Sequence, residues 1–199
     1  SVILSIRSEN NSGSVSIGLI SLKIMSFLGK SGKSLIEFFN LSGNINLLLF
    51  FIILFNNKKT YSHIGILSAM PEEVGIILNK LESITTYKFG DLELYSGKFI
   101  LDNSEEILIT TGWSGWGKVS AARATTRLIS SNLNSIPIDI AIFTGVAGAV
   151  DKKLKKWDLV LADSIMQHDI DARPLFDKYV IPALNNKKIL PNSGLLKKI

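Results

Sequence analysis

HIGILSAMPEEV, residues 63–74, reads as a strand that leads directly into a helix. Its first six residues are mostly apolar, as in a buried strand. Pro71 suits the first helical position because its missing N–H has no partner there, and Glu72 and Glu73 lie in the first turn, where the helix dipole favours negative charge. Apolar residues then recur at helical spacing at Val74, Ile77, Leu78 and Leu81. This stretch predicts an α/β fold.

The same pattern of a strand followed by a glycine turn recurs downstream. The predicted elements are a hairpin-like pair around residues 91–100, strands at 106–111, 138–144 and 157–163, and a helix at 118–130. Glycine turns follow two of these strands, at Gly112–Gly117 and at Gly145–Gly148. Strands that end in Gly- or Ala-lined turns place those turns along one sheet edge, where α/β folds bind ligands.

The first 60 residues differ from the rest in composition. They are rich in Ser, Asn, Leu, Ile and Phe, contain no proline and show no sustained helical or strand pattern, so we expect a domain boundary near Thr60, between an unassigned extension (1–60) and an α/β domain (61–199). The apolar run Leu47–Phe55 is about half as long as a membrane-spanning helix. We therefore expect a cytoplasmic protein; the alternative is export or membrane contact through this run, as the apolar part of a signal sequence.

Composition excludes several kinds of site. The 22 Lys and Arg residues exceed the 17 Asp and Glu residues, but the lysines are scattered, as on a solvated surface, so we expect no nucleic-acid partner. The absence of cysteine excludes disulfides and thiolate chemistry, and two histidines, His63 and His168, cannot form an all-imidazole zinc site. The segment His168–Asp171 is expected to be a polar loop without a metal.

One motif supports a different class of enzyme. GWSGWGKV, residues 112–119, matches a phosphate-binding P-loop except at Val119, where a hydroxyl would bind Mg²⁺. The strand that ends at Asp163 is a candidate metal-binding acidic strand, so a P-loop nucleotide triphosphatase remains an alternative.

Five blocks follow one another in a fixed order: residues 64–74, 114–122, 144–148, 157–163 and 168–171. Their order and spacing resemble those of the 5′-methylthioadenosine/S-adenosylhomocysteine nucleosidases of the nucleoside phosphorylase superfamily. The resemblance extends from His63 to about Asp171. It implies a phosphorylase/hydrolase-like α/β fold, with a central mixed β-sheet flanked by helices.

The resemblance also implies a reaction. Members of this family hydrolyse the N-glycosidic bond of methylthioadenosine and S-adenosylhomocysteine and release adenine, in methionine salvage and S-adenosylhomocysteine recycling, without a metal or organic cofactor. By this resemblance, Glu73 corresponds to the glutamate that helps to activate the attacking water. A carboxylate suits this role because it can stabilise an oxocarbenium-like transition state and take a proton from water. A non-catalytic nucleoside-binding relative is the main alternative.

The substrate-binding residues implied by the resemblance are Ala69, Met70, Trp116, Val146, Ala147 and Gly148. Met70 corresponds to a ribose or alkylthio contact, and Ala147 and Gly148 to the backbone floor beneath the nucleoside. Trp116 stands where the family usually has an aliphatic residue, and Val146 stands where a serine commonly orients the water.

Two further expectations concern the C-terminal side. The family's downstream segment, which grips the ribose hydroxyls and protonates the purine, has no counterpart before Ile199, and no Asp or Glu follows Asp177. We therefore expect a fold that is incomplete on its C-terminal side and weak activity for the chain as given. Relatives use the region equivalent to Arg173–Leu184 to close the neighbouring subunit's pocket, so we expect a homodimer for a complete version.

Overall fold

The computed structural model describes residues 20–25, 61–101, 104–131, 133–147, 151–153 and 159–191. Its strands are β1 (Ile20–Met25), β2 (His63–Ser68), β3 (Glu82–Phe89), β4 (Leu92–Ile100), β5 (Glu106–Trp113), β6 (Ile140–Ala147) and β7 (Leu159–Leu161). Its helices are α2 (Pro71–Leu78) and α3 (Lys118–Ser130), with the short 3₁₀ turns η1 (Leu133–Ser135) and η2 (Pro182–Leu184).

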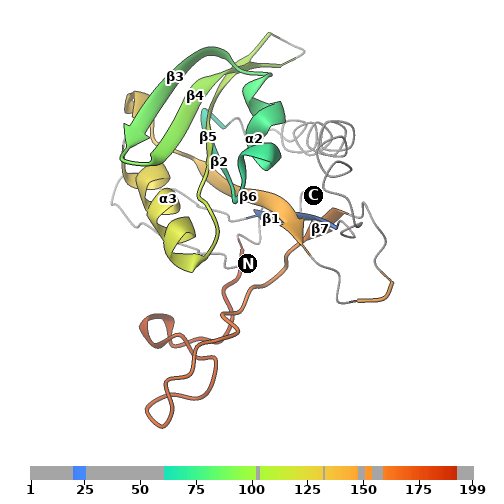
Figure 1. The fold of residues 1–199 in the computed structure, drawn as a ribbon, viewed down its shortest axis with the longest axis vertical. Helices are drawn as coiled ribbons and strands as arrows, with labels where there is room; N and C mark the ends of the chain where they lie inside the picture. The colour runs from blue at the N-terminus through green and yellow to red at the C-terminus, as the bar shows by residue number, and fades with distance from the viewer. Residues whose placement is uncertain are drawn as a thin grey trace.

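The described strands form one mixed sheet in the order β3-β4-β5-β2-β6-β1-β7 (Figure 1). The four strands β5, β2, β6 and β1 are parallel, whereas β3 and β4 continue the sheet antiparallel on one side and β7 pairs antiparallel with β1 on the other. Because β2, β5 and β6 are parallel, their C-terminal ends lie along the same edge. The mixed sheet implied by the sequence is confirmed.

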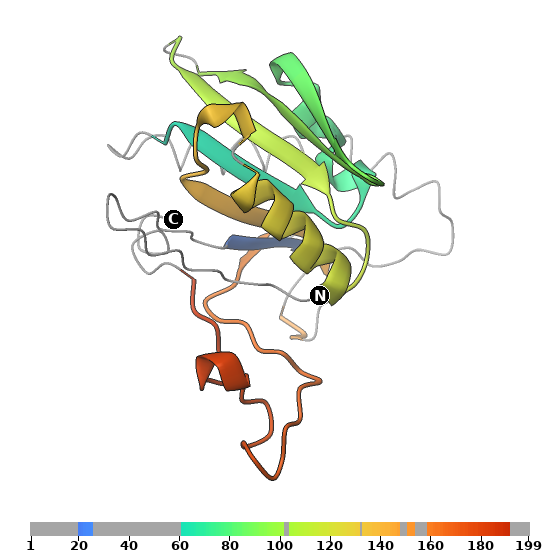
Figure 2. The same ribbon diagram turned by 90° about the vertical axis from the view of Figure 1, so that its left-hand side faces the viewer.

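Helices α2 and α3 cover opposite faces of the sheet (Figures 1 and 2). Ile77 of α2 packs with Ile64 and Ile66 in one buried cluster, while Leu128 of α3 packs with Leu67 in another. Alternate residues of β2 therefore bury apolar side chains against both helices, as expected for a parallel strand covered on both faces. On the α3 face the fit is tight: a Cβ at Gly65 would lie 2.8 Å from Leu128 Cδ2.

Most element predictions hold, with shifted ends. The helix at Lys118–Ser130 is confirmed, whereas β6 begins at Ile140, two residues later than predicted, and ends at Ala147. The hairpin-like pair predicted around residues 91–100 is instead a single strand, β4, whose partner β3 lies at residues 82–89; the sequence prediction missed β3 because it is largely solvent-exposed and lacks apolar alternation. Another missed element is β1, which lies between β6 and β7; alternating apolar and polar residues from Ile20 to Ile24 were an available signal.

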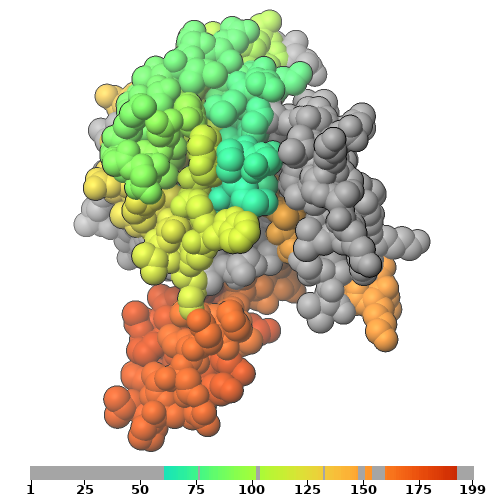
Figure 3. Space-filling view, viewed as in Figure 1, coloured from blue at the N-terminus to red at the C-terminus, as the bar shows by residue number. Residues whose placement is uncertain are grey.

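After β7 the chain leaves the sheet as an arm, residues 163–191, which projects from the body (Figure 3). The ammonium group of Lys118, at the start of α3, pairs with the Asp169 carboxylate and ties the arm to the body. Large apolar side chains on the arm are exposed, among them Leu175 and Leu184. Within the described ranges no helix is long and apolar enough to cross a membrane, and the run at residues 47–55 lies outside them.

Candidate active site

The carboxylate of Glu73 is held by three backbone amides at the C-terminal edge of the sheet. Its Oε2 accepts hydrogen bonds from the N–H groups of Ala69 (2.9 Å) and Met70 (3.0 Å). Its Oε1 accepts one from the N–H of Val146 (2.9 Å), at the end of β6. Charge-assisted bonds of this kind fix the position of a carboxylate, and Oε1 keeps a lone pair for a further donor.

Local sequence explains this geometry. Met70 is extended (φ −130°, ψ 150°) and turns the chain from β2 into α2, where Pro71 occupies the first helical position. Glu73 then lies in the first turn, so its side chain folds back onto the amides that precede the helix. Gly145 leaves the space that the carboxylate fills, because a Cβ there would lie 2.8 Å from Glu73 Oε1.

The glycine loop after β5 lies beside the end of β2. The N–H of Ser114 donates to the carbonyl of Ser68 at 2.8 Å, which fixes the loop next to the turn that carries Ala69. Gly115 (φ +77°) and Gly117 (φ +96°) adopt left-handed backbone conformations that favour glycine. Between them Trp116 is 79% exposed, so its ring is available at the surface of this edge.

The structure brings together most of the residues predicted for the site. Glu73 meets the predicted Gly145–Gly148 segment at Val146, as expected from the convergence of strand ends, although residues 145–147 form the end of β6 rather than a turn. Ala147 ends β6 next to Val146, whereas Gly148 lies outside the described residues. In the described part of the chain no hydrogen bond joins Trp116 to Glu73, so a role for Trp116 stays a prediction.

The other motifs occupy different surroundings. Lys118 of the P-loop-like segment pairs with Asp169, and this hydrogen bond is the main cause that lowers the pKa of Asp169. Arg173 binds both carboxylate oxygens of Asp171 and lowers its pKa to about 2. Among the described residues no three His, Asp or Glu side chains come together as a metal site.

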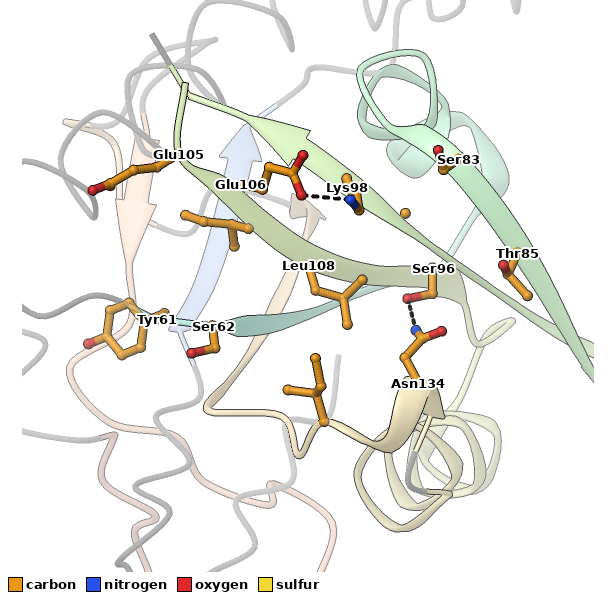
Figure 4. Close-up of a pocket in the computed structure, with 13 residues that line it drawn as sticks. Tyr61, Ser62, Ser83, Thr85, Ser96, Lys98, Glu105, Glu106, Leu108 and Asn134 are labelled. Carbon is orange, nitrogen blue, oxygen red and sulfur yellow. Dashed lines mark hydrogen bonds and ion pairs between the residues drawn. The ribbon is translucent and has the colours of Figure 1, made fainter. Parts of the chain in front are cut away.

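A pocket of about 630 Å³ lies at the opposite end of the strands (Figure 4). It is lined by residues at or just before the start of β2 and β5, by the open end of the β3–β4 hairpin and by η1. Among these residues are Ser62, Ser96, Leu108 and Asn134. Because Glu73 lies at the other edge of the sheet, we do not assign the proposed substrate to this pocket.

Comparisons with known proteins identify the family. The sequence model of the phosphorylase superfamily matches residues 63–199. The chain belongs to this superfamily.

Individual members of the superfamily are similar in sequence to part of this chain. The 5′-methylthioadenosine/S-adenosylhomocysteine nucleosidase of Staphylococcus aureus (strain bovine RF122 / ET3-1) is 41% identical over 109 residues, which are 55% of this chain and 44% of the relative. The chain thus spans about half the length of the curated relatives it matches.

Solved structures show the same likeness. The adenine complex of the nucleosidase from Colwellia psychrerythraea 34H has a TM-score of 0.59 at 29% identity, over 69% of this chain and 53% of that one. A futalosine hydrolase mutant from Helicobacter pylori strain 26695 has a TM-score of 0.58 at 28% identity, over 68% of this chain and 57% of that one.

Sequence reasoning missed several features of this superfamily member. Gly145 was predicted to lie in a turn, but it lies in β6, where the nearby Glu73 carboxylate leaves no room for a side chain. His63 was treated as the first residue of an apolar strand, although a histidine in such a strand is itself a signal of a buried polar partner. In the described part of the chain the hydroxyls of Ser68 and Thr111 are buried without a hydrogen-bond partner, which the sequence could not indicate.

Proposed function

We propose that this protein cleaves the N-glycosidic bond of 5′-methylthioadenosine and S-adenosylhomocysteine by hydrolysis and releases adenine. The observation that carries the proposal is the Glu73 carboxylate, fixed by three backbone amides at the sheet edge. The likeness to nucleosidases in sequence and structure supports the choice of substrates. A cytoplasmic location is part of the proposal, since these substrates belong to intracellular methionine metabolism.

In the proposed reaction Glu73 acts on water. As the C1′–N9 bond breaks, positive charge develops at C1′ and the purine leaves with the bonding electrons. The free lone pair of Glu73 Oε1 accepts a proton from a water that attacks C1′, the leaving purine takes a proton from solvent, and Glu73 later returns its proton to solvent. The amides of Ala69, Met70 and Val146 keep the carboxylate aimed during this transfer.

The substrate-binding part of the proposal places the nucleoside against Ala69, Met70, Val146, Ala147 and Gly148, with Trp116 beside its 5′ substituent. Val146 offers its backbone N–H to Glu73 but has no side-chain hydroxyl for the water, so the carboxylate alone orients it in this proposal. Trp116 is larger than an aliphatic side chain and favours a flat or extended 5′ group.

The futalosine hydrolase among the structural neighbours gives a second candidate substrate. An assay that detects and identifies the released purine base tests both, using the protein with methylthioadenosine, S-adenosylhomocysteine and futalosine, with and without phosphate. Release from methylthioadenosine that does not need phosphate is expected. Binding without turnover would assign the protein to non-catalytic nucleoside binders, and turnover only with phosphate would make it a phosphorylase.

A further inference from the structure

His63 begins a row of hydrogen-bonded side chains buried within the sheet. Its Nδ1 lies 2.7 Å from the carbonyl oxygen of Ile136, and its Nε2 lies 2.7 Å from Thr110 Oγ1. Thr110 Oγ1 lies 2.8 Å from Ser96 Oγ. His63 and Thr110 are completely buried and Ser96 is 2% exposed, so these groups depend on one another for hydrogen bonds.

The row continues to the rim of the pocket. Asn134 Nδ2 donates to Ser96 Oγ at 2.5 Å (Figure 4). Tyr87 OH donates to Asn134 Oδ1 at 2.6 Å, near the surface. Asn134 lies in η1, the connection between α3 and β6, and has a left-handed backbone (φ 57°). Ser96, Asn134 and Ile136 all line the pocket, so the row forms its inner wall.

Each protonation state of His63 requires one direction of hydrogen bonding along this row. A carbonyl oxygen only accepts, so Nδ1 carries a proton and a neutral imidazole has its lone pair on Nε2. The Thr110 hydroxyl can donate either to Ser96 or to Nε2; in this state it donates to Nε2, Ser96 donates to Thr110 and Asn134 donates to Ser96. Every bond in the row is made once, and the donors on Thr110, Ser96 and Asn134 all point toward His63.

Protonation reverses the inner bonds. Nε2 of a charged imidazole donates to Thr110, whose hydroxyl then donates to Ser96. With Asn134 Nδ2 still donating to Ser96, the Ser96 proton would have no acceptor within the row, which is unfavourable for a side chain that is only 2% exposed. Rotation of the Asn134 carboxamide by half a turn removes the conflict, because Oδ1 then accepts from Ser96 and Nδ2 donates to the oxygen of Tyr87.

Burial lowers the pKa of His63 below the ordinary value of 6.5, more than the hydrogen bond to Ile136 and the charge of Asp139 raise it. Among the described residues Asp139, which precedes β6, is the charged side chain that acts on His63; its Oδ2 accepts from the backbone N–H of His63 at 3.0 Å. Tyr87, on β3, is the other titratable group of the row. The neutral arrangement is therefore the one present at neutral pH.

We propose that this row is a proton-operated switch, in which protonation of buried His63 flips the carboxamide of Asn134 at the pocket rim. The flip exchanges a donor and an acceptor on the inner wall of the pocket. Tyr87 changes from donor to acceptor toward Asn134, so its own proton turns to solvent. The pocket therefore offers a polar ligand a different hydrogen-bonding pattern in acid.

Nuclear magnetic resonance on the isotope-labelled full chain tests the switch. At neutral pH we expect His63 to be the tautomer protonated on Nδ1. On acidification the Asn134 side-chain amide signals should shift with the same midpoint as the His63 ring, while circular dichroism shows a folded chain. The variant H168N assigns the two histidine signals.

Two variants separate the switch from a general effect of acid. S96A removes the hydroxyl that connects Thr110 to Asn134. His63 should therefore still titrate, while the Asn134 amide signals no longer follow it. T85A removes a pocket hydroxyl outside the row and should leave the coupling unchanged. The proposal is overturned by a neutral tautomer protonated on Nε2, by an Asn134 response that survives in S96A or is absent in the wild type, or by a His63 that stays neutral until the chain unfolds.

Discussion

Glu73 combines two roles that its sequence position alone does not distinguish. A glutamate in the first turn of a helix interacts favourably with the helix dipole wherever that helix lies. Here the carboxylate also connects the ends of β2 and β6, because it binds amides of Met70 and Val146. Replacing it therefore affects both the proposed chemistry and the local structure.

We predict that Glu73→Gln lowers turnover by about a hundredfold or more, the scale of lost acid–base assistance. A glutamine has one acceptor oxygen and cannot satisfy all three amides, so the free energy of unfolding should also fall, by about 1–3 kcal/mol. Steady-state kinetics and urea unfolding of a complete version measure the two effects. Glu72→Gln, an exposed neighbour in the same turn, is the control, and equal activity in both variants would remove Glu73 from the mechanism.

Gly145 gives a second prediction at this scale. In Gly145→Ala the new Cβ would lie 2.8 Å from Glu73 Oε1, so the carboxylate must move away from Val146. Turnover should fall by roughly tenfold to a hundredfold, as for other small displacements of a catalytic group. Gly75→Ala is the matched control: nothing lies within 4 Å of its Cβ, and it should stabilise α2 by about 0.5–1 kcal/mol. Unchanged kinetics in Gly145→Ala would mean that the carboxylate position is not critical.

At the scale of elements, the sequence predicted those that bury apolar side chains. The strand at residues 63–68 and the helix at 118–130 follow from apolar periodicity. β3 does not, because it is paired through its backbone and exposed along most of its length. The site was predictable as a meeting of strand ends, whereas the bond from Val146 to Glu73 depends on tertiary packing that no local pattern encodes.

The arm gives a prediction for an element. Asp169→Asn removes the ion pair with Lys118 and should release the arm from the start of α3. Such partly exposed pairs contribute no more than about 1 kcal/mol, so tryptic cleavage after Lys178 should become at most about fivefold faster. Asp177→Asn, which breaks a pair with Lys187 within the arm, is the control. Equal cleavage rates in the two variants would show that Lys118 does not hold the arm.

For the whole molecule, His63 predicts how stability depends on pH. Its pKa is lower in the folded protein than the ordinary value of 6.5, so the unfolded chain binds more protons as the pH falls. The contribution of neutral His63 to the free energy of unfolding is complete above pH 6.5, and it is lost as the pH falls from 6.5 toward the folded-state pKa of His63. Urea unfolding between about pH 7.5 and about pH 5.5 should show this loss, with a smaller slope in His63→Asn. The same slope in the variant would assign the effect to other groups.

The second prediction for the whole molecule is a symmetric homodimer. The exposed apolar side chains of the arm, such as Leu175 (85% exposed), suit contact with another subunit. Sedimentation at roughly micromolar concentration should give a dimer that Leu175→Asp weakens. Leu190→Asp, outside residues 173–184, is the control; a monomeric wild type contradicts the prediction.

The way in which Glu73 is held also affects how such a protein can evolve. All three groups that bind the carboxylate are main-chain amides, and every residue except proline supplies one. Side chains at Ala69, Met70 and Val146 can therefore change while the carboxylate keeps its place, and in the proposed site such changes would alter the choice of nucleoside. Gly145 has no such freedom. Selection for a new substrate can act on three positions around one fixed chemical group.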